Sequence, residues 1–278
     1  MRIAFASIIA GLVLISCATA QVAQALPMGS FSLGRPPLLE AAFQAFLDGQ
    51  QRWSYVETGG DVKADGSIPA RSVIRNDPSL PYAQQSVPLL IKGQQPTEKQ
   101  LLEWAANCEK QAERRLKAVE ALAVAARDQG FRLRLLNREV RPLLEEAKVV
   151  AEDETSITYE VPMQELGGPE ATRVDDHRLT ARVGRATRQF EQVTIRQTKT
   201  VRIAAGKYYD GLTEVDFARP DPNYASVPIR ITFTVTNKPL VGEGRTSMRL
   251  VERKDFRRVT PYDERFNVKL APLNLLEF

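Results

Sequence analysis

The chain of 278 residues is 43% hydrophobic and carries a formal net charge of +4 at pH 7. This hydrophobic content is ample for a folded core, which excludes disorder as the default, and the length fits one large domain or two small ones. The net charge is too small to predict nucleic-acid binding by itself.

The first twenty residues have the three parts of a secretory signal peptide. Met1–Arg2 supply the positive start, residues 3–15 form an uninterrupted run of apolar or small residues, and Ala18–Ala20 supply the small residues that a signal peptidase accepts. The run is well short of the roughly 20 residues that a membrane-spanning helix needs, and no comparable run follows. We therefore expect cleavage after Ala20, export of residues 21–278 to the periplasm as a single α+β domain, and no transmembrane segment in the mature chain.

An alternative processing site lies inside this leader. Leu14–Ser16 and the following Cys17 match the short lipobox of bacterial lipoproteins, in which the cysteine is lipidated and becomes the new N-terminus. Lipidation at Cys17 would anchor the protein to the envelope, whereas cleavage after Ala20 would release it. After cleavage at Ala20, Cys108 is the only cysteine left, so the mature chain could form no intramolecular disulfide.

Four elements are predicted directly after the leader. Apolar residues at three- and four-residue spacing predict a helix over Leu38–Gly49. Turn sequences such as Asp65-Gly66 then separate three β-rich runs, which are Arg52–Thr58, Ile68–Arg75 and Gln84–Lys92. Because short turns join antiparallel neighbours, these runs predict a three-stranded meander.

The clearest helix of the chain is predicted over Glu98–Gln129. Thr97 and Gln100 form a capping box at its start, and Gly130 ends it. Small and apolar residues, Cys108 among them, line one narrow face that is rich in alanine. Such a face allows close approach, so we expect this helix to lie along a sheet and cover it. Cys108 is then expected to be a small core residue.

The second half of the chain is predicted to be a series of antiparallel strands. In the run over residues 227–236, Ile229, Ile231 and Phe233 alternate with arginine and threonine, so one face is expected to pack and the other to meet water. The predicted strands are Ala147–Ala151, Ile157–Pro162, Arg173–Val183, Phe190–Ile203, Glu214–Phe217, Val227–Thr236, Ser247–Arg253 and Arg265–Leu270.

Residues that carry catalysis or bind metals are scarce. His177 is the only histidine, and its neighbours Asp175 and Asp176 favour a solvated turn over a catalytic base. Zinc sites need three or four histidine and cysteine ligands, and the mature chain has two such residues. No glycine-rich phosphate-binding motif occurs. We therefore expect no enzymatic activity, no catalytic residue, no metal and no cofactor.

Positive charge is concentrated in residues 173–207, which contain nine lysines and arginines against three acidic residues. In the alternating run Phe190–Ile203, Arg196 and Arg202 share the polar face. A basic stripe of this kind suits an anionic head group or an acidic partner surface. The other interpretation is a solubilising outer face of the sheet, which such charges protect from edge pairing.

The order of these elements resembles that of the periplasmic lipoprotein carriers of the LolA and LolB type. The similar parts are the helix over Leu39–Phe46, the strand over Arg52–Thr58 that follows it, and the capped helix that begins at Glu98. The chain looks most like a proteobacterial periplasmic relative of these carriers. The resemblance implies a half-barrel, in which a curved sheet and covering helices hold an acyl chain between them.

Together these observations predict an α+β fold with a mostly antiparallel, curved, half-barrel-like sheet covered by the one long helix. The expected function is the binding or carrying of a lipid or an acylated protein, without catalytic chemistry. The candidate cavity residues are Trp53, Tyr55, Ile229, Ile231 and Phe233, and the head-group candidates are Arg196 and Arg202. The alternative is an extracytoplasmic scaffold or envelope-assembly protein that binds an acidic partner through the basic strand face. Neither function involves nucleic acid.

Overall fold

The computed structural model describes residues 35–49, 52–124, 133–135, 138–166, 173–199, 201–203, 207–238 and 245–262. The predicted signal peptide, with its alternative processing sites at Cys17 and Ala20, lies outside these residues. The strand expected over Arg265–Leu270 also lies outside them.

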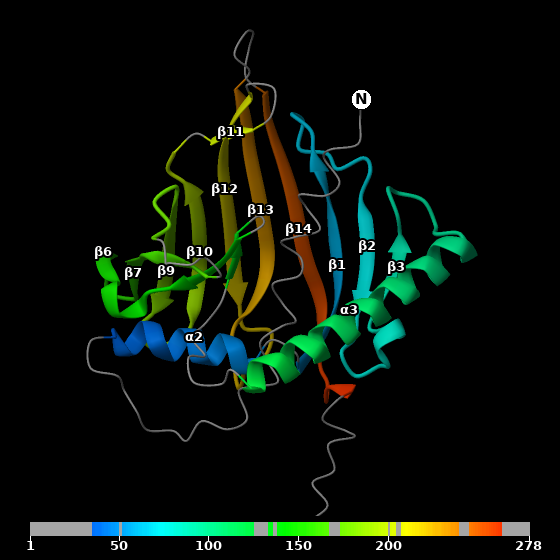
Figure 1. Ribbon diagram of the computed structural model, residues 1–278, viewed down its shortest axis with the longest axis horizontal. Helices are drawn as coiled ribbons and strands as arrows, with labels where there is room; N and C mark the ends of the chain where they lie inside the picture. Colours follow the sequence, from blue (N-terminus) through cyan, green and yellow to red (C-terminus); the bar gives the residue numbers. More distant parts are fainter. Residues whose placement is uncertain are drawn as a thin grey trace, which may run out of the picture.

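An antiparallel sheet of 11 strands forms the body of the described structure. Its strands are β1 (Trp53–Val62), β2 (Ser72–Asn76), β3 (Ser86–Leu90), β6 (Lys148–Glu152), β7 (Ser156–Val161), β9 (His177–Gly184), β10 (Phe190–Gln197), β11 (Val201–Ile203), β12 (Lys207–Ala218), β13 (Val227–Lys238) and β14 (Arg245–Arg258). Ten of them follow the order β3-β2-β1-β14-β13-β12-β10-β9-β7-β6, and β11 pairs with β12. The sheet is therefore open, with β3 and β6 at its two edges (Figure 1).

The predicted N-terminal meander is confirmed, because β1 pairs with β2 and β2 pairs with β3. Between β1 and β2, Asp65 Oδ1 accepts hydrogen bonds from the backbone N–H and the hydroxyl of Ser67, at 2.9 and 2.6 Å. These two bonds lower the pKa of the Asp65 carboxyl below its usual value. Gly66 has a φ of 80°, a conformation that favours glycine. The Asp65-Gly66 sequence therefore forms the turn that it predicts.

The second half is β-rich as predicted, with different strand boundaries. The run expected over Phe190–Ile203 is divided into β10 and β11, because the chain leaves the strand at Thr198 and Lys199. Two strands are much longer than predicted: β12 already begins at Lys207, and β14 extends to Arg258. The β6–β7 hairpin forms where it was expected.

A second, three-stranded sheet was not predicted. It has the order β4-β5-β8 and consists of β4 (Leu133–Leu135), β5 (Arg138–Pro142) and β8 (Met163–Leu166). These segments have three to five residues, and in β5 the buried residues Val140 and Pro142 are accompanied only by charged ones. Segments this short show no readable alternation, which is why the sequence gives no sign of the sheet.

The first helix, α2 (Pro37–Gly49), lies against the sheet at β9 and β10. Leu39, Ala42 and Phe43 are buried there, as their helical spacing predicts. Phe43 and Phe46 both contact the ring of Phe190 edge-on, with ring centroids 4.9 and 6.0 Å apart. These aromatic contacts fix the helix on the sheet.

The second helix, α3 (Glu98–Val124), starts at the predicted capping box. The backbone N–H of Thr97 donates to Gln100 Oε1 at 2.8 Å, and the backbone N–H of Gln100 donates to Thr97 Oγ1 at 3.3 Å. Within the described residues, no helix combines the length and apolar character needed to cross a membrane.

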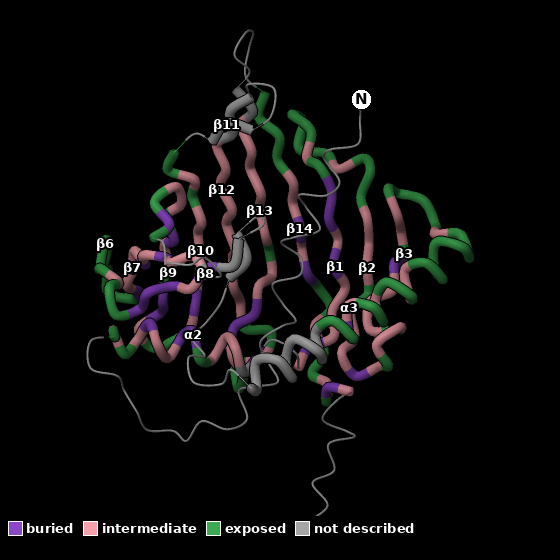
Figure 2. Tube along the Cα trace, in the orientation of Figure 1, coloured by how far each residue is buried: buried purple, intermediate pink, exposed green. Residues whose placement is uncertain are grey.

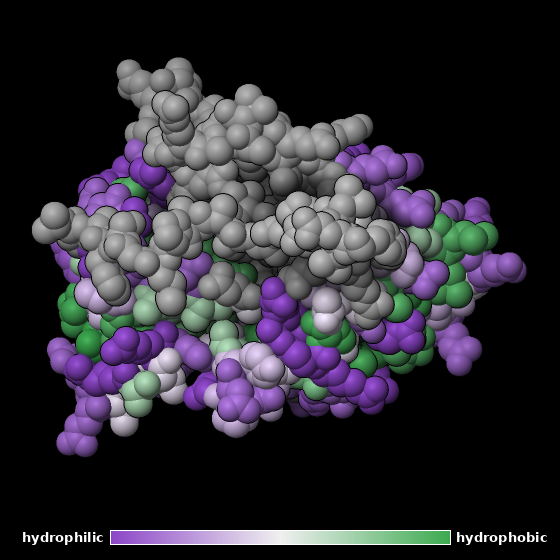
Figure 3. Space-filling model, turned by 90° about the horizontal axis from the view of Figure 1, so that it is seen from below, coloured by the Kyte–Doolittle hydropathy of each residue, from purple (hydrophilic) through white to green (hydrophobic). Residues whose placement is uncertain are grey.

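The expected covering of the sheet by this long helix is not confirmed. The principal contacts of α3 are with β3 and with the short 3-10 helix η4 (Tyr82–Gln84), so it lies by one edge of the sheet (Figure 1). Its small residues Ala105, Cys108 and Ala112 are half-buried or buried, whereas Leu102 on another side is 67% exposed. The end of the molecule near both helices shows hydrophilic and hydrophobic patches side by side (Figure 3).

The buried core lies between α2 and strands β7, β9 and β10, at the β6 side of the sheet (Figure 2). Its members include Leu39, Phe43, Val140, Leu144, Tyr159, Val161, Met163, Leu179, Ala181, Val183 and Phe190. Val193, Ile195 and Phe217 are partly buried against this cluster. The described core therefore reaches as far as β12.

Candidate ligand-binding face

Strand register assigns every residue of the large sheet to one of two faces, because side chains alternate along a strand and paired residues share a side. We call the side that bears Val193 and Phe217 the core face, since both pack against the buried core. The opposite side is called the outer face.

On the core face, one row of residues continues from the core across four strands. Val215 of β12 is paired with Ile231 of β13, Ile231 with Val251 of β14, and Val251 with Gly59 of β1. Val251 and Gly59 are buried and Ile231 is half-buried. A Cβ at Gly59 would lie 3.2 Å from Val251 Cγ2, so glycine leaves room for the valine. Apolar character therefore extends beyond the cluster under α2.

All five predicted cavity residues lie on this core face. Phe233 and Ile229 flank Ile231 at two-residue spacing. Ile229 lies at a register shift between β12 and β13, so its face is assigned by its spacing from Ile231 along β13 and not by pairing. Trp53 and Tyr55 precede Glu57 at the same spacing on β1, and Glu57 is paired with Arg253, two residues from Val251. The three β13 residues and Tyr55 are half-buried. The five residues predicted from the sequence therefore lie on the same side of the sheet.

Trp53 differs from the other four because it is already enclosed by protein. Its side chain is 3% exposed, and its ring meets Tyr224 and Phe256 edge-on, with centroids 5.9 and 6.2 Å apart. The guanidinium of Arg258 lies 5.4 Å from the Trp53 ring and 4.2 Å from the Tyr224 ring. Trp53 therefore serves the packing at this end of the sheet.

The two predicted head-group arginines lie on the other side of the sheet. Arg196 is paired with Leu212 and Arg202 with Tyr208, two positions of β12 that share a face. That face is the outer one, because Thr213, next to Leu212, is paired with core-face residue Phe233. Arg196 and Arg202 share a face, as predicted, but the sheet separates them from the apolar candidates.

Most of the basic residues predicted to form a positive surface are neutralised by nearby carboxylates. Arg178 Nε lies 3.2 Å from Glu160, and Arg182 lies 3.0 Å from Glu191 and 3.2 Å from Asp153. Further ion pairs join Lys199 to Asp175, Arg185 to Glu152 and Arg173 to Glu146. These acidic partners come largely from neighbouring strands and turns, which explains why a count along residues 173–207 overstates the charge. The pairs favour a solubilising face.

The core face contains a buried ion pair that sequence reasoning missed. Arg253 Nε donates to Glu57 Oε2 at 3.0 Å, and the two residues are 8% and 6% exposed. The guanidinium also lies 4.8 Å from the centre of the Tyr55 ring. The signal in the sequence was Glu57 itself, which occupies an inward position of the alternating run that begins at Trp53.

A second core-face arginine, Arg249, has no such partner in the described part of the chain. Its strand neighbours are Phe233 on β13 and Asp61 on β1. Arg249 is half-buried, and its Nε is inaccessible to solvent with no hydrogen-bond partner among the described residues. Asp61 is exposed, and no ion pair joins it to Arg249. The Arg249 guanidinium therefore borders the apolar row without a carboxylate partner from the described residues.

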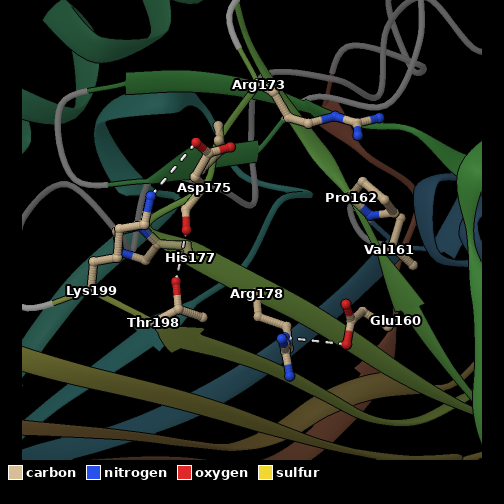
Figure 4. Close-up of a pocket in the computed structure, with 10 residues that line it drawn as sticks. Glu160, Val161, Pro162, Arg173, Asp175, His177, Arg178, Thr198 and Lys199 are labelled. Carbon is tan, nitrogen blue, oxygen red and sulfur yellow. Dashed lines mark hydrogen bonds and ion pairs between the residues drawn. The ribbon is translucent and has the colours of Figure 1, made fainter.

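A separate pocket of about 380 Å³ surrounds His177 (Figure 4). The expected solvated turn is wrong, because His177 begins β9 and its side chain is only 10% exposed. Its Nδ1 lies 3.0 Å from Asp176 Oδ1. Thr198 lines the pocket, and its hydroxyl donates to the Asp175 carbonyl at 2.8 Å.

This pocket is a depression lined mostly by polar and charged residues. Its lining residues are Glu160, Val161, Pro162, Arg173, Val174, Asp175, His177, Arg178, Thr198 and Lys199. Arg178, Arg173 and Lys199 are each held by a carboxylate. This described lining contains no serine or cysteine that His177 could activate as a nucleophile.

Metal-binding and thiol chemistry have little support in the described part of the chain. No three histidine, cysteine, aspartate or glutamate side chains gather there in a way that could hold a metal ion. Cys108 is half-buried, and its Sγ lies 3.8 Å from the Ser86 carbonyl oxygen. Its place in the α3 contact with β3 fits the predicted packing role.

Comparison of the chain with protein-family models, with curated proteins and with solved structures finds no match. The resemblance to lipoprotein carriers therefore stays a prediction.

Proposed function

We propose that the protein binds a lipid, or the acyl chain of an acylated protein, against the core face of β12, β13 and β14. The observation that carries this proposal is the extent of the apolar surface. The described core reaches as far as Phe217 on β12, yet Ile229, Ile231 and Phe233 continue the same face on β13 and are only half-buried. Apolar side chains in this state gain free energy when a ligand covers them.

Burial of these half-buried side chains favours a chain-like apolar ligand. Full burial of one isoleucine or phenylalanine side chain contributes about 1.5–3 kcal/mol, so three half-buried side chains offer a few kcal/mol to a ligand that covers them. The β13 residues project at two-residue spacing along one strand, which forms a narrow row. No covalent step is part of the proposed function.

The scaffold alternative relies on the outer face, and the structure offers it less support. Most of the arginines and lysines that would attract an acidic partner are paired with carboxylates of the same chain. An acidic partner would have to displace these pairs. Arg196 and Arg230 on the outer face, and Arg188 in the turn after β9, are exposed and free of ion pairs among the described residues, so they remain available to an acidic partner.

Lipid binding is tested on the purified mature protein by mass spectrometry of its organic extract and by titration with a fluorescent fatty-acid analogue. We expect copurifying lipid and saturable binding of the analogue. Ile231→Thr should weaken binding several-fold, because it removes apolar surface from the core face. Leu250→Thr is the matched control, since Leu250 is a half-buried apolar residue on the outer face of neighbouring β14.

Two results would count against this function. One is an extract without lipid together with a protein that does not bind the analogue. The other is an equal loss of binding in Ile231→Thr and Leu250→Thr, which would show that binding of the analogue does not depend on the core face.

The proposal includes export to the periplasm through the leader. Intact-mass measurement of the protein from soluble and membrane fractions tests it. Cleavage after Ala20 gives a chain that begins at Gln21, whereas lipidation gives a heavier, membrane-bound chain that begins at Cys17. A chain that retains Met1 in both fractions would contradict export.

A further inference from the structure

One arginine on the core face, Arg249, has no partner for its guanidinium among the described residues. Five buried side-chain atoms lack a hydrogen-bond partner among the described residues, and three of them belong to charged side chains. Two of those side chains are satisfied elsewhere: Glu40 pairs with Arg35 at 3.3 Å, and Arg141 donates to Gln164 at 3.1 Å. Arg249 is the charged side chain left with no partner at all among the described residues.

An enclosed donor on a charged group is expensive to leave unsatisfied, and native proteins rarely do so without a functional reason. The contrast with Arg253 is informative because both arginines lie on the core face of β14 at four-residue spacing. Arg253 is neutralised by Glu57, which comes from β1. Arg249 faces the exposed Asp61 at the equivalent place on β1, and no ion pair forms.

We propose that Arg249 and the row Ile229, Ile231 and Phe233 form a binding site for a long-chain fatty acid. This inference rests on the proposed function and names its ligand class. The carboxylate of the fatty acid pairs with the two terminal nitrogens of the guanidinium, which are not among the enclosed atoms and have the planar geometry to bind both of its oxygens. Phe233 is paired with Arg249 on the neighbouring strand, so the acyl chain next to the carboxylate lies on the apolar row.

The width of the row favours a fatty acid over a two-chain lipid. Among the described core-face residues near the row, Arg249 supplies one free positive charge, because Arg253 is neutralised by Glu57. One such charge matches one carboxylate. The row occupies a single strand, which matches the width of one acyl chain, and from Phe233 to Ile229 it covers about 13 Å at 3.3 Å per residue, so it contacts the part of the chain nearest the carboxylate.

The test compares oleate with its methyl ester, both below their aggregation concentrations, in calorimetric titrations of the full mature protein. The two probes have the same chain and differ in head-group charge. We expect oleate to bind about tenfold more tightly than methyl oleate, since a charge-assisted pair of this kind contributes about that factor. Arg249→Gln should reduce oleate affinity to about that of the ester.

Arg196→Gln is the matched control, because Arg196 is an exposed arginine on the outer face without an ion pair among the described residues. It should leave oleate affinity unchanged. The wild-type comparison of oleate with its ester needs no substitution, so the inference remains testable if Arg249→Gln does not fold.

The outcomes separate this inference from the function on which it rests. Equal affinity of the wild-type protein for oleate and methyl oleate overturns the role of Arg249 and leaves lipid binding intact. Binding of phosphatidylglycerol vesicles without binding of oleate overturns the fatty-acid assignment. Failure of oleate, the ester and the vesicles to bind overturns lipid binding itself. An equal effect of Arg249→Gln and Arg196→Gln also contradicts the inference.

Discussion

Arg253 and Glu57 join β14 to β1 through a buried ion pair, in which Arg253 Nε donates to Glu57 Oε2 at 3.0 Å. Glu57→Ala would leave the Arg253 guanidinium buried without its counter-charge. Such removal of one partner costs about 3–5 kcal/mol of unfolding free energy. Urea denaturation followed by circular dichroism measures the loss.

The double variant Glu57→Leu/Arg253→Met is the control for this prediction. Replacing both partners with apolar residues of similar size removes the unpaired charge, so most of the lost stability should return. A Glu57→Ala protein as stable as the wild type would contradict the burial of the pair.

Asp153 organises the turn between β6 and β7. Its carboxylate accepts bonds from the backbone and hydroxyl groups of Thr155 and Ser156, at 2.8–3.0 Å. These bonds hold the pKa of the Asp153 carboxyl far below its usual 3.8. A pKa depressed in the folded state contributes stability above the unfolded-state value, and this contribution is lost as the pH falls through the folded-state pKa.

The free energy of unfolding of Asp153→Asn should therefore fall less steeply than that of the wild type as the pH is lowered into the acid range. Denaturation midpoints of the two proteins should differ most at neutral pH and converge as the pH falls well below about 4. Glu154→Gln, which changes an exposed carboxylate of the same turn, should keep the wild-type profile. A constant difference between Asp153→Asn and the wild type at all pH values would contradict the titration.

Phe190 is the centre of the aromatic contacts that hold α2 on the sheet. Its ring lies 4.9 Å from that of Phe43 and 5.5 Å from that of Phe217. Phe190→Ala should cost about 3–5 kcal/mol of unfolding free energy, because it opens a cavity under the helix. Chemical denaturation measures this effect. Phe256→Ala removes a half-buried ring and should cost less, so an equal effect would contradict the central position of Phe190.

The capping box of α3 can be tested separately from the sheet. Thr97→Ala removes the hydroxyl that accepts from the Gln100 N–H and should cost about 1 kcal/mol. Lys99→Ala changes an exposed residue of the same turn and should be nearly neutral. Thermal unfolding compares the two. If both melt at the wild-type temperature, the cap contributes nothing to stability.

Features set by neighbouring residues could be predicted from the sequence. The Asp65-Gly66 turn, the capping box at Thr97 and the alternation around Ile231 all depend on contacts within a few positions, and each forms as expected. The short β5 and β8 strands were missed because their stability comes from pairing with each other. No local pattern records such a pairing.

The candidate site shows the same limit. Alternation placed Arg196 and Arg202 on one face of their run and Ile231 on one face of another. Whether these two faces coincide depends on the register between strands, which the sequence does not give. Arg249 was missed for this reason, since it becomes visible only when β14 is set beside Phe233 and Asp61.

The central position of β14 has a consequence for how the protein assembles. This last described strand lies between β1 and β13, and its contact with β1 joins residues 196 positions apart. Until β14 arrives, the early meander and the later strands are separate fragments, each with an unpaired edge that can recruit another chain. Closing so long a loop is slow. The pairing of β14 with β1 therefore removes both of these exposed edges in one step.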